Sequence, residues 1–155
     1  MRRVNVFSAQ PEYDETDPRG YAAAVANLGH ELGSQELSLK LFEIPPGQSL
    51  CPYHYEYVEE WLLVLAGTGT LRLPEGEQQV EEGDLVLFSA GPQGAHKVTN
   101  RGQEKLRIVM FSSSREPAVA VYPDSDKVGV WSGNDEDKWM FRGGQSHLEY
   151  YDGEV

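Results

Sequence analysis

The 155-residue sequence has a single cysteine, few basic residues and no long apolar run. The lone Cys51 excludes an internal disulfide and is typical of a reducing compartment. Thirteen Lys and Arg stand against 25 Asp and Glu, and the net charge of -12 disfavours nucleic acids and anionic membranes as partners. The longest apolar runs, Tyr21–Ala26 and Trp61–Ala66, are too short for a membrane helix. Because no apolar segment follows the basic residues near Met1, we expect a cytoplasmic protein without a signal peptide.

Turn-forming residues, in contrast, are abundant, with 16 Gly and 9 Pro. Leu37, Leu39 and Leu41 alternate with polar residues, which is typical of a strand with one buried face. Similar short apolar segments follow, each bounded by Gly, Pro, Asn or Asp, and Gly67-Thr-Gly69 predicts a tight hairpin turn. Roughly seven or eight short strands between residues 35 and 113 predict an all-β protein, an antiparallel sandwich or barrel.

The length predicts one domain, which we divide into three parts. An N-terminal extension covers residues 1–34, a barrel core covers residues 35–113, and a C-terminal arm covers residues 114–155. Within the extension, Tyr21–Leu28 is too short to distinguish a helix from a strand, and Gly29 or Gly33 would end a helix.

The C-terminal arm contains two apolar segments, Val119–Tyr122 and Val128–Trp131, that are predicted to be strands. Beyond them, four aromatic side chains would be costly to expose: Trp139, Phe141, Tyr150 and Tyr151. We therefore expect the arm to pack on the barrel or on a partner subunit.

The stretch Pro45–Gly67 carries most of the candidate functional residues. Side chains alternate between the two faces of a strand, so without a bulge every second residue points the same way. Three potential metal ligands share one parity: His54, Glu56 and Glu60. The same face continues with the apolar Leu62 and Val64. A polar trio leading into a buried row predicts a cavity whose mouth holds a metal ion.

The opposite parity of this stretch carries aromatic residues and the cysteine. Tyr53, Tyr55 and Tyr57 form an outward ladder, for which a subunit or sheet interface is the simplest interpretation. Cys51 falls on the face opposite His54, and we expect it to be a buried, inert thiol.

Two segments resemble the motifs of a known superfamily. The spacing His54-x-Glu56-x3-Glu60-x6-Gly67 resembles the first motif of the cupins, usually His-x-His-x3-4-Glu-x6-Gly, and the segment from Gly83-Asp84 to His96-x3-Asn100 resembles the second. The stretches PYHYEYVEEW, GPQGAH and VYPDSDKVGV look like those of small single-domain cupins of bacteria and archaea. The resemblance implies an all-β protein with a single jelly-roll β-barrel (a double-stranded β-helix) and, as is common in the superfamily, a homodimer.

Carried over residue by residue, the resemblance implies metal ligands at His54, Glu60 and His96. Glu56 stands where the superfamily commonly has a second His. We expect it to be a fourth ligand, and the alternative is a substitution that weakens the site. Two imidazoles and two carboxylates favour one divalent ion, such as Mn, Fe, Zn or Ni, over copper.

The resemblance leaves the activity open between two classes. The first is a metal-dependent cupin acting on a small polar molecule, either as a dioxygenase or as an isomerase. The second is a non-catalytic cupin that binds a small ligand or serves as a structural domain with a degenerate metal site. No general base beyond the ligands can be named from the sequence. Asn100 is expected to be a turn residue, and His30 and His147 are expected to lie at the surface.

Overall fold

A computed structural model of the protein describes residues 1–133, 136–143 and 148–154. Most of the regular structure in these residues is β-strand, as predicted. The N-terminal half contains β1 (Ala24–Asn27), α1 (Leu28–Leu32), β2 (Leu37–Ile44), β3 (Tyr55–Glu56), β4 (Glu60–Ala66) and β5 (Thr68–Leu73). The remainder contains β6 (Gly76–Glu81), β7 (Leu85–Phe88), η1 (Pro92–Gly94), β8 (Lys97–Thr99), β9 (Leu106–Ser113), β10 (Ala118–Tyr122), η2 (Pro123–Ser125), β11 (Lys127–Trp131) and β12 (Lys138–Arg142).

The strands form three antiparallel sheets. The largest has the order β1-β2-β9-β4-β7, a second has the order β6-β5-β8, and a third has the order β12-β11-β10-β3. The hydrogen bonds between described residues do not close these sheets into a ring. The prediction of an antiparallel all-β jelly roll is therefore confirmed, with separate facing sheets in place of one continuous barrel.

The main core lies between the first two sheets. Leu62 and Val64 on β4 are almost fully buried, as their parity predicted. They pack with Ile44 from β2 and Ile108 from β9 against Leu71, Val80 and Val98 of the β6-β5-β8 sheet. Successive side chains of a strand point to opposite faces, so each sheet contributes one of its two faces to this core.

A second apolar cluster covers the outer face of the five-stranded sheet. Leu41 and Val109 point outward there and pack with Leu28 of α1. The segment Tyr21–Leu28, for which helix and strand were both open, contains the strand β1, which pairs with β2, and α1 begins at its last residue. Asn27 caps α1 by accepting a hydrogen bond from the His30 backbone N–H, and Gly33 ends it in the left-handed conformation. None of the helices in the described residues has both the length and the apolar character needed to span a bilayer.

The predicted hairpin at Gly67 is wrong. β4 and β5 are separated by Gly67 alone and belong to different sheets, so the chain passes from one sheet to the other at this residue. Gly67 has a φ of 81°, and a Cβ on it would lie 2.7 Å from the Lys105 carbonyl oxygen. Only glycine combines this left-handed backbone with such a close approach.

Replacing Gly67 by Ala is therefore expected to destabilise the fold by ~2 to 4 kcal/mol, because backbone strain and the clash with Lys105 add. Gly47 is a matched control, because its φ of 79° is similar and nothing lies within 4 Å of its Cβ position. Urea unfolding of both variants measures the difference. Equal losses in Gly67→Ala and Gly47→Ala would show that the close approach carries no cost.

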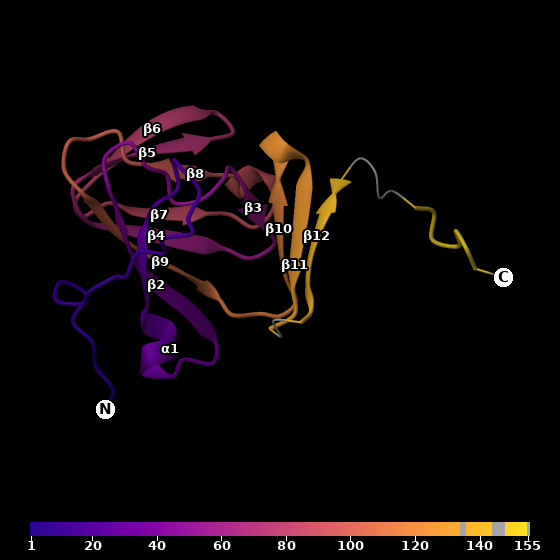
Figure 1. Cartoon of the computed structure of the whole chain (residues 1–155), viewed down its shortest axis with the longest axis horizontal. Coiled ribbons are helices and arrows are strands. Elements are labelled where there is room, and N and C mark those ends of the chain that lie inside the picture. Colours follow the sequence, from indigo (N-terminus) through magenta and orange to yellow (C-terminus); the bar gives the residue numbers. More distant parts are fainter. Residues whose placement is uncertain (134–135, 144–147, 155) are drawn as a thin grey trace.

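The C-terminal strands form the third sheet at one end of the sandwich, and the chain end extends away from it (Figure 1). The predicted strands in the arm are present as β10 and β11. β10 pairs with β3, with Val121 opposite Tyr55, which fixes the arm beside the Pro45–Gly67 stretch. The aromatic side chains beyond β11 are exposed in the single chain, Trp139 at 46% and Tyr150 at 87%. That a partner subunit covers them stays a prediction, as does the division of the chain at residues 34 and 113.

Candidate metal centre

The stretch that carries the predicted ligands is not one strand. β3 ends at Glu56 and β4 begins at Glu60, and the two strands belong to different sheets. The residues between them form a bend, so the alternation assumed for positions 54–64 is interrupted. The side chains of His54 and Glu60 nevertheless converge with that of His96.

The backbones of His54 and His96 are paired directly. The His54 N–H donates to the His96 carbonyl at 3.1 Å, and the His96 N–H donates to the His54 carbonyl at 2.8 Å. This isolated antiparallel bridge places the two imidazole rings 4.8 Å apart between centroids. It explains how two histidines 42 positions apart reach the same point.

Backbone carbonyls orient both imidazoles. Nδ1 of His54 lies 3.0 Å from the Pro52 carbonyl oxygen, and Nδ1 of His96 lies 2.9 Å from the Gly94 carbonyl oxygen. A carbonyl only accepts, so each Nδ1 carries the proton and donates it. Each Nε2 is consequently an unprotonated nitrogen with a free lone pair, the form that binds a metal.

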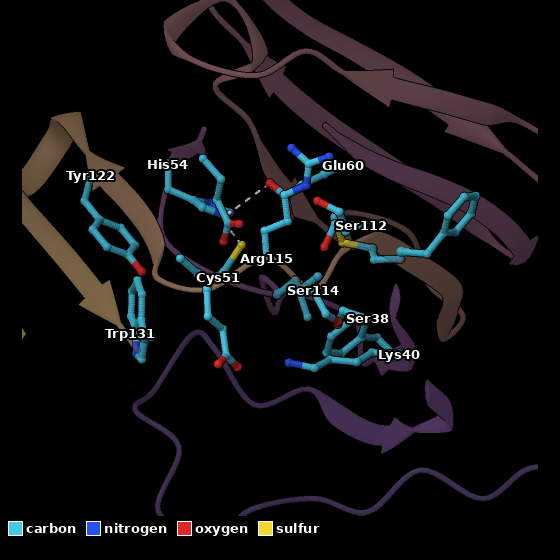
Figure 2. Close-up of a pocket in the computed structure, with 18 residues that line it drawn as sticks. Ser38, Lys40, Cys51, His54, Glu60, Ser112, Ser114, Arg115, Tyr122 and Trp131 are labelled. Atoms are coloured by element: carbon cyan, nitrogen blue, oxygen red, sulfur yellow. Dashed lines mark hydrogen bonds and ion pairs between the residues drawn. The ribbon is translucent and has the colours of Figure 1, made fainter. Parts of the chain in front are cut away.

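Glu60 lies between the two rings. Its Oε2 is 3.8 Å from Nε2 of His54 and 3.8 Å from Nε2 of His96 (dashed for His54 in Figure 2), too far for a hydrogen bond. One ligand atom from each of the three residues lies within 4.8 Å of the others. Burial, and then the charge of Glu56, raise the pKa of Glu60 to about 8. Among the described residues, no Lys or Arg forms a salt bridge with the Glu60 carboxyl group.

His96 is the most deeply buried member of the group. Its side chain is fully buried, and its ring stacks on Phe88 with centroids 3.7 Å apart. Burial, and then the nearby His54, lower the pKa of His96 to about 4, and burial also lowers the pKa of His54. Nε2 of His96 has no hydrogen-bond partner among the described residues. A buried polar atom without a partner costs roughly 1 to 3 kcal/mol, so this nitrogen indicates a missing ligand.

Glu56 lies in the same pocket but outside this group of three. Burial raises its pKa, and the positive charge of Lys40 partly opposes this. Lys40 also lowers the pKa of Glu60, against the larger effects of burial and Glu56. The structure therefore brings His54, Glu60 and His96 together and places Glu56 on the adjoining wall, where its role as a fourth ligand stays a prediction.

Cys51 is on the pocket side, not on the face opposite His54 as predicted. Its Sγ lies 3.6 Å from Nδ1 of His54, because the chain does not follow a regular strand between Cys51 and β3. The prediction of an inert thiol agrees with its environment, since burial raises the pKa of Cys51 to about 12. Tyr122 of β10 stacks on the His54 ring at 5.7 Å and forms the adjacent wall.

The predicted outward tyrosine ladder is wrong for Tyr53. This side chain is buried at 9% exposure, and the guanidinium of Arg72 lies 4.0 Å from the centre of its ring. Tyr55 and Tyr57 do contact each other edge to face, with Tyr57 exposed. Asn100 is a turn residue, as expected, because its side-chain amide donates to the Ile44 and Glu104 carbonyls. His147 lies outside the described residues, and His30 is exposed on α1.

The site opens into a pocket of about 510 Å³. One side holds His54, Tyr122 and Trp131, and the opposite side carries polar residues that the two motifs do not include (Figure 2): Ser38, Lys40, Ser112 and Ser114. Arg115 lines the pocket as well. The alternation of β2 and β9 could have predicted the inward position of Ser38, Lys40 and Ser112. The contribution of Tyr122 and Trp131 could not be predicted, because it depends on the pairing of β10 with β3.

Comparison with known proteins supports the same interpretation. The cupin domain family model matches residues 40–112. Together with the fold, this match places residues 40–112 in the cupin superfamily, which confirms the resemblance seen in the two motifs. The comparison with curated proteins found no match.

Several solved structures share the fold over most of the chain. A protein provisionally assigned as a sugar phosphate isomerase from Acidithiobacillus ferrooxidans is 24% identical, with a TM-score of 0.80 over 93% of this chain and 92% of that one. A sugar phosphate isomerase of the cupin superfamily from Silicibacter pomeroyi is 21% identical, with a TM-score of 0.76 over 96% and 98% of the two chains. The polyketide cyclase RemF from Streptomyces resistomycificus is 23% identical, with a TM-score of 0.63 over 76% and 83%. At these identities the likeness establishes the fold.

The three converging residues fit a divalent metal ion. An ion about 2.1 Å from each ligand atom brings those atoms to roughly 3 to 4 Å from one another, close to the 3.8 Å from the Glu60 oxygen to each imidazole nitrogen. Two neutral imidazoles and one carboxylate suit Mn, Fe, Ni or Zn. The buried Nε2 of His96 would gain the partner that it lacks among the described residues.

Proposed function

We propose that the protein is a divalent-metal cupin that binds a small polar molecule beside the ion. His54, Glu60 and His96 hold the metal, and Glu56 is the candidate fourth ligand. The observation that carries this proposal is the orientation of the two imidazoles, whose Nδ1 protons are given to backbone carbonyls while both Nε2 atoms face one carboxylate oxygen. A metal ion between these groups would give the buried His96 nitrogen the partner that it lacks among the described residues.

The chain's own residues define what such a site does. The carbonyls of Pro52 and Gly94 fix the tautomer of each imidazole, so the rings need not reorganise when a ligand binds. The pocket volume is that of a small-molecule site. Tyr122 and Trp131 cover one side of it and limit the access of water. A bound divalent ion supplies Lewis acidity, which polarises a carbonyl or hydroxyl group of the bound molecule.

Among the reaction classes open to the sequence, we favour isomerisation over oxygenation. Two solved structures that match 93% and 96% of this chain are described as a provisionally assigned and an assigned sugar phosphate isomerase, which supports a polyhydroxylated substrate. Glu56 has a raised pKa and lies in the pocket, which suits a group that moves a proton next to the ion. Incubating the metal-loaded protein with a panel of sugars and sugar phosphates in D₂O tests this. Deuterium exchange at a carbon next to the carbonyl is expected. Its absence across the panel would contradict isomerisation and favour a protein that only binds a small molecule.

Replacing Glu56 by Ala separates its two candidate roles. If Glu56 is a metal ligand, the Ala variant is expected to bind metal at least ~10-fold more weakly, and Glu56→His is expected to retain metal. Metal titration of both variants, with Glu59→Gln as a control at an exposed neighbouring carboxylate, gives the answer. Unchanged metal affinity in Glu56→Ala would show that Glu56 is not a ligand.

We further infer a homodimer, as the resemblance implied; the cytoplasmic location expected from the N-terminal sequence stays a prediction. Its support is the set of exposed apolar side chains on strands at the sheet edges, Leu85 and Leu87 on β7 and Met140 and Phe141 on β12. Light scattering is expected to give twice the mass of one chain. A monomer mass at micromolar concentration would contradict the inference.

A further inference from the structure

The inner face of the five-stranded sheet carries a row of hydroxyl groups that begins beside Glu60. Ser38 on β2 is directly opposite Ser112 on β9, and Ser112 is directly opposite Glu60 on β4. The three residues therefore form one row across neighbouring strands on the inner face. Since strands lie about 4.8 Å apart, Ser112 is next to the Glu60 position and Ser38 is roughly 10 Å from it.

Two positive charges complete this wall. Lys40 shares the inner face of β2 with Ser38, and its ammonium points toward the middle of the pocket (Figure 2). Arg115 follows Ser114, whose backbone N–H continues the β9 ladder by donating to the Glu36 carbonyl at 2.8 Å. Both cations line the same pocket as the serines.

The charges of this wall are not neutralised by partners. Arg72, Arg101, Lys105 and Arg107 each form an ion pair with a carboxylate. Within the described residues, Lys40 and Arg115 form no ion pair or hydrogen bond, although the chain has nearly twice as many acidic as basic residues. Three acidic residues line the same pocket: Glu56 and Glu60, whose pKa values Lys40 lowers, and Glu116, whose carboxylate lies against Gly133.

We infer that Ser38, Ser112 and Ser114 with Lys40 and Arg115 form a binding subsite for a phosphate group. A phosphate monoester has three terminal oxygens and a charge close to -2, which matches several hydroxyl donors and two cations better than the two oxygens of a carboxylate do. The ligand class is thus a phosphorylated sugar or polyol with its phosphate on this wall. The inference rests on the proposed function in one respect: the sugar or polyol end of the ligand would lie at the metal.

Paired ligands test the subsite. Ribose 5-phosphate and ribose are titrated against the Zn-loaded protein, followed by amide chemical shifts, and inorganic phosphate is titrated against the metal-free protein. Ribose 5-phosphate is expected to bind at least ~10-fold more tightly than ribose, and inorganic phosphate is expected to bind without metal. In Lys40→Met and in Arg115→Gln, the affinities for ribose 5-phosphate and for inorganic phosphate are both expected to fall ~10-fold or more. In Arg115→Gln, whose charge is not coupled to Glu56 or Glu60, the bound Zn is expected to be unchanged.

The control variants Lys105→Met and Arg101→Gln make the same charge changes away from the pocket and are expected to leave phosphate binding unchanged. Equal binding of ribose and its phosphate, or phosphate binding that persists in both pocket variants, would overturn the subsite. Phosphate binding that requires Zn and is insensitive to Lys40 and Arg115 would also overturn it, because the phosphate would then be a metal ligand. A wild type that binds no Zn, but binds phosphate through Lys40 and Arg115, would refute the metal site and keep the subsite.

Discussion

Replacing Glu60 by Gln is expected to lower metal affinity at least ~100-fold while leaving the fold intact. The loss of a group that only supports a ligand typically costs 10- to 100-fold, and the loss of a ligand itself costs more. The Gln side chain keeps the size of Glu60 but has no negative charge to offset that of the ion. Metal content after growth in metal-replete medium and a competition titration with a chelator measure the effect. His96→Ala is expected to have the same consequence, because it removes the nitrogen that no other described residue satisfies.

Two control variants separate ligand loss from general damage. Glu59→Gln makes the same change at an exposed neighbour, and His30→Ala removes an exposed imidazole. Both are expected to keep full metal content. His96→Ala also leaves a cavity beside Phe88 and will lose stability, so its metal content is measured on protein that circular dichroism shows to be folded. Unchanged metal affinity in Glu60→Gln would refute the ligand set.

Removing the metal is expected to make the free energy of unfolding fall as the pH rises above 6.5. In the metal-free protein, Glu60 remains protonated up to a pKa of about 8, whereas the unfolded chain has lost this proton above about pH 4.5. The native state then binds one more proton than the unfolded state, so the free energy of unfolding falls as the pH rises. The slope approaches ~1.4 kcal/mol per pH unit, or at most ~2 kcal/mol between pH 6.5 and 8.

The histidines act in the opposite direction, but only at lower pH. The pKa of His96 is about 4 in the folded protein and near 6.5 in the unfolded chain, so its contribution rises with pH up to about 6.5 and is constant above it. The decrease in the free energy of unfolding above pH 6.5 is therefore caused by the carboxyl groups. Bound metal keeps Glu60 ionised and removes the fall. Urea unfolding at several pH values, with and without chelator, measures this. A metal-free protein that is equally stable at pH 6.5 and 8, or a fall of undiminished size in Glu60→Gln, would contradict the expectation.

The sequence was sufficient for the strand content and for the residues that converge. His54, Glu60 and His96 were identifiable because their spacing resembles two cupin motifs, and Leu62 and Val64 because alternation predicts burial. The path of the chain between them was not predictable. The bend after Glu56 and the change of sheet at Gly67 depend on which strands become neighbours, and no local pattern encodes that.

The pocket walls show the same limit. Cys51 was assigned to the wrong face because alternation was assumed where no strand forms, and Tyr53 is buried by contact with the distant Arg72. Tyr122 enters the site only through the pairing of β10 with β3. The composition of the pocket walls therefore depends on pairing between strands that are distant in the sequence. The metal ligands could be predicted because each lies at a fixed short spacing within a motif.

The most direct measurement of the central claim is anomalous diffraction from crystals grown with Mn²⁺ or Zn²⁺. One strong peak is expected within ~2.0 to 2.3 Å of Nε2 of His54, Nε2 of His96 and a carboxylate oxygen of Glu60. A crystal at saturating ion concentration with no peak between these three side chains, or with His96 Nε2 bonded to a protein group instead, would contradict it.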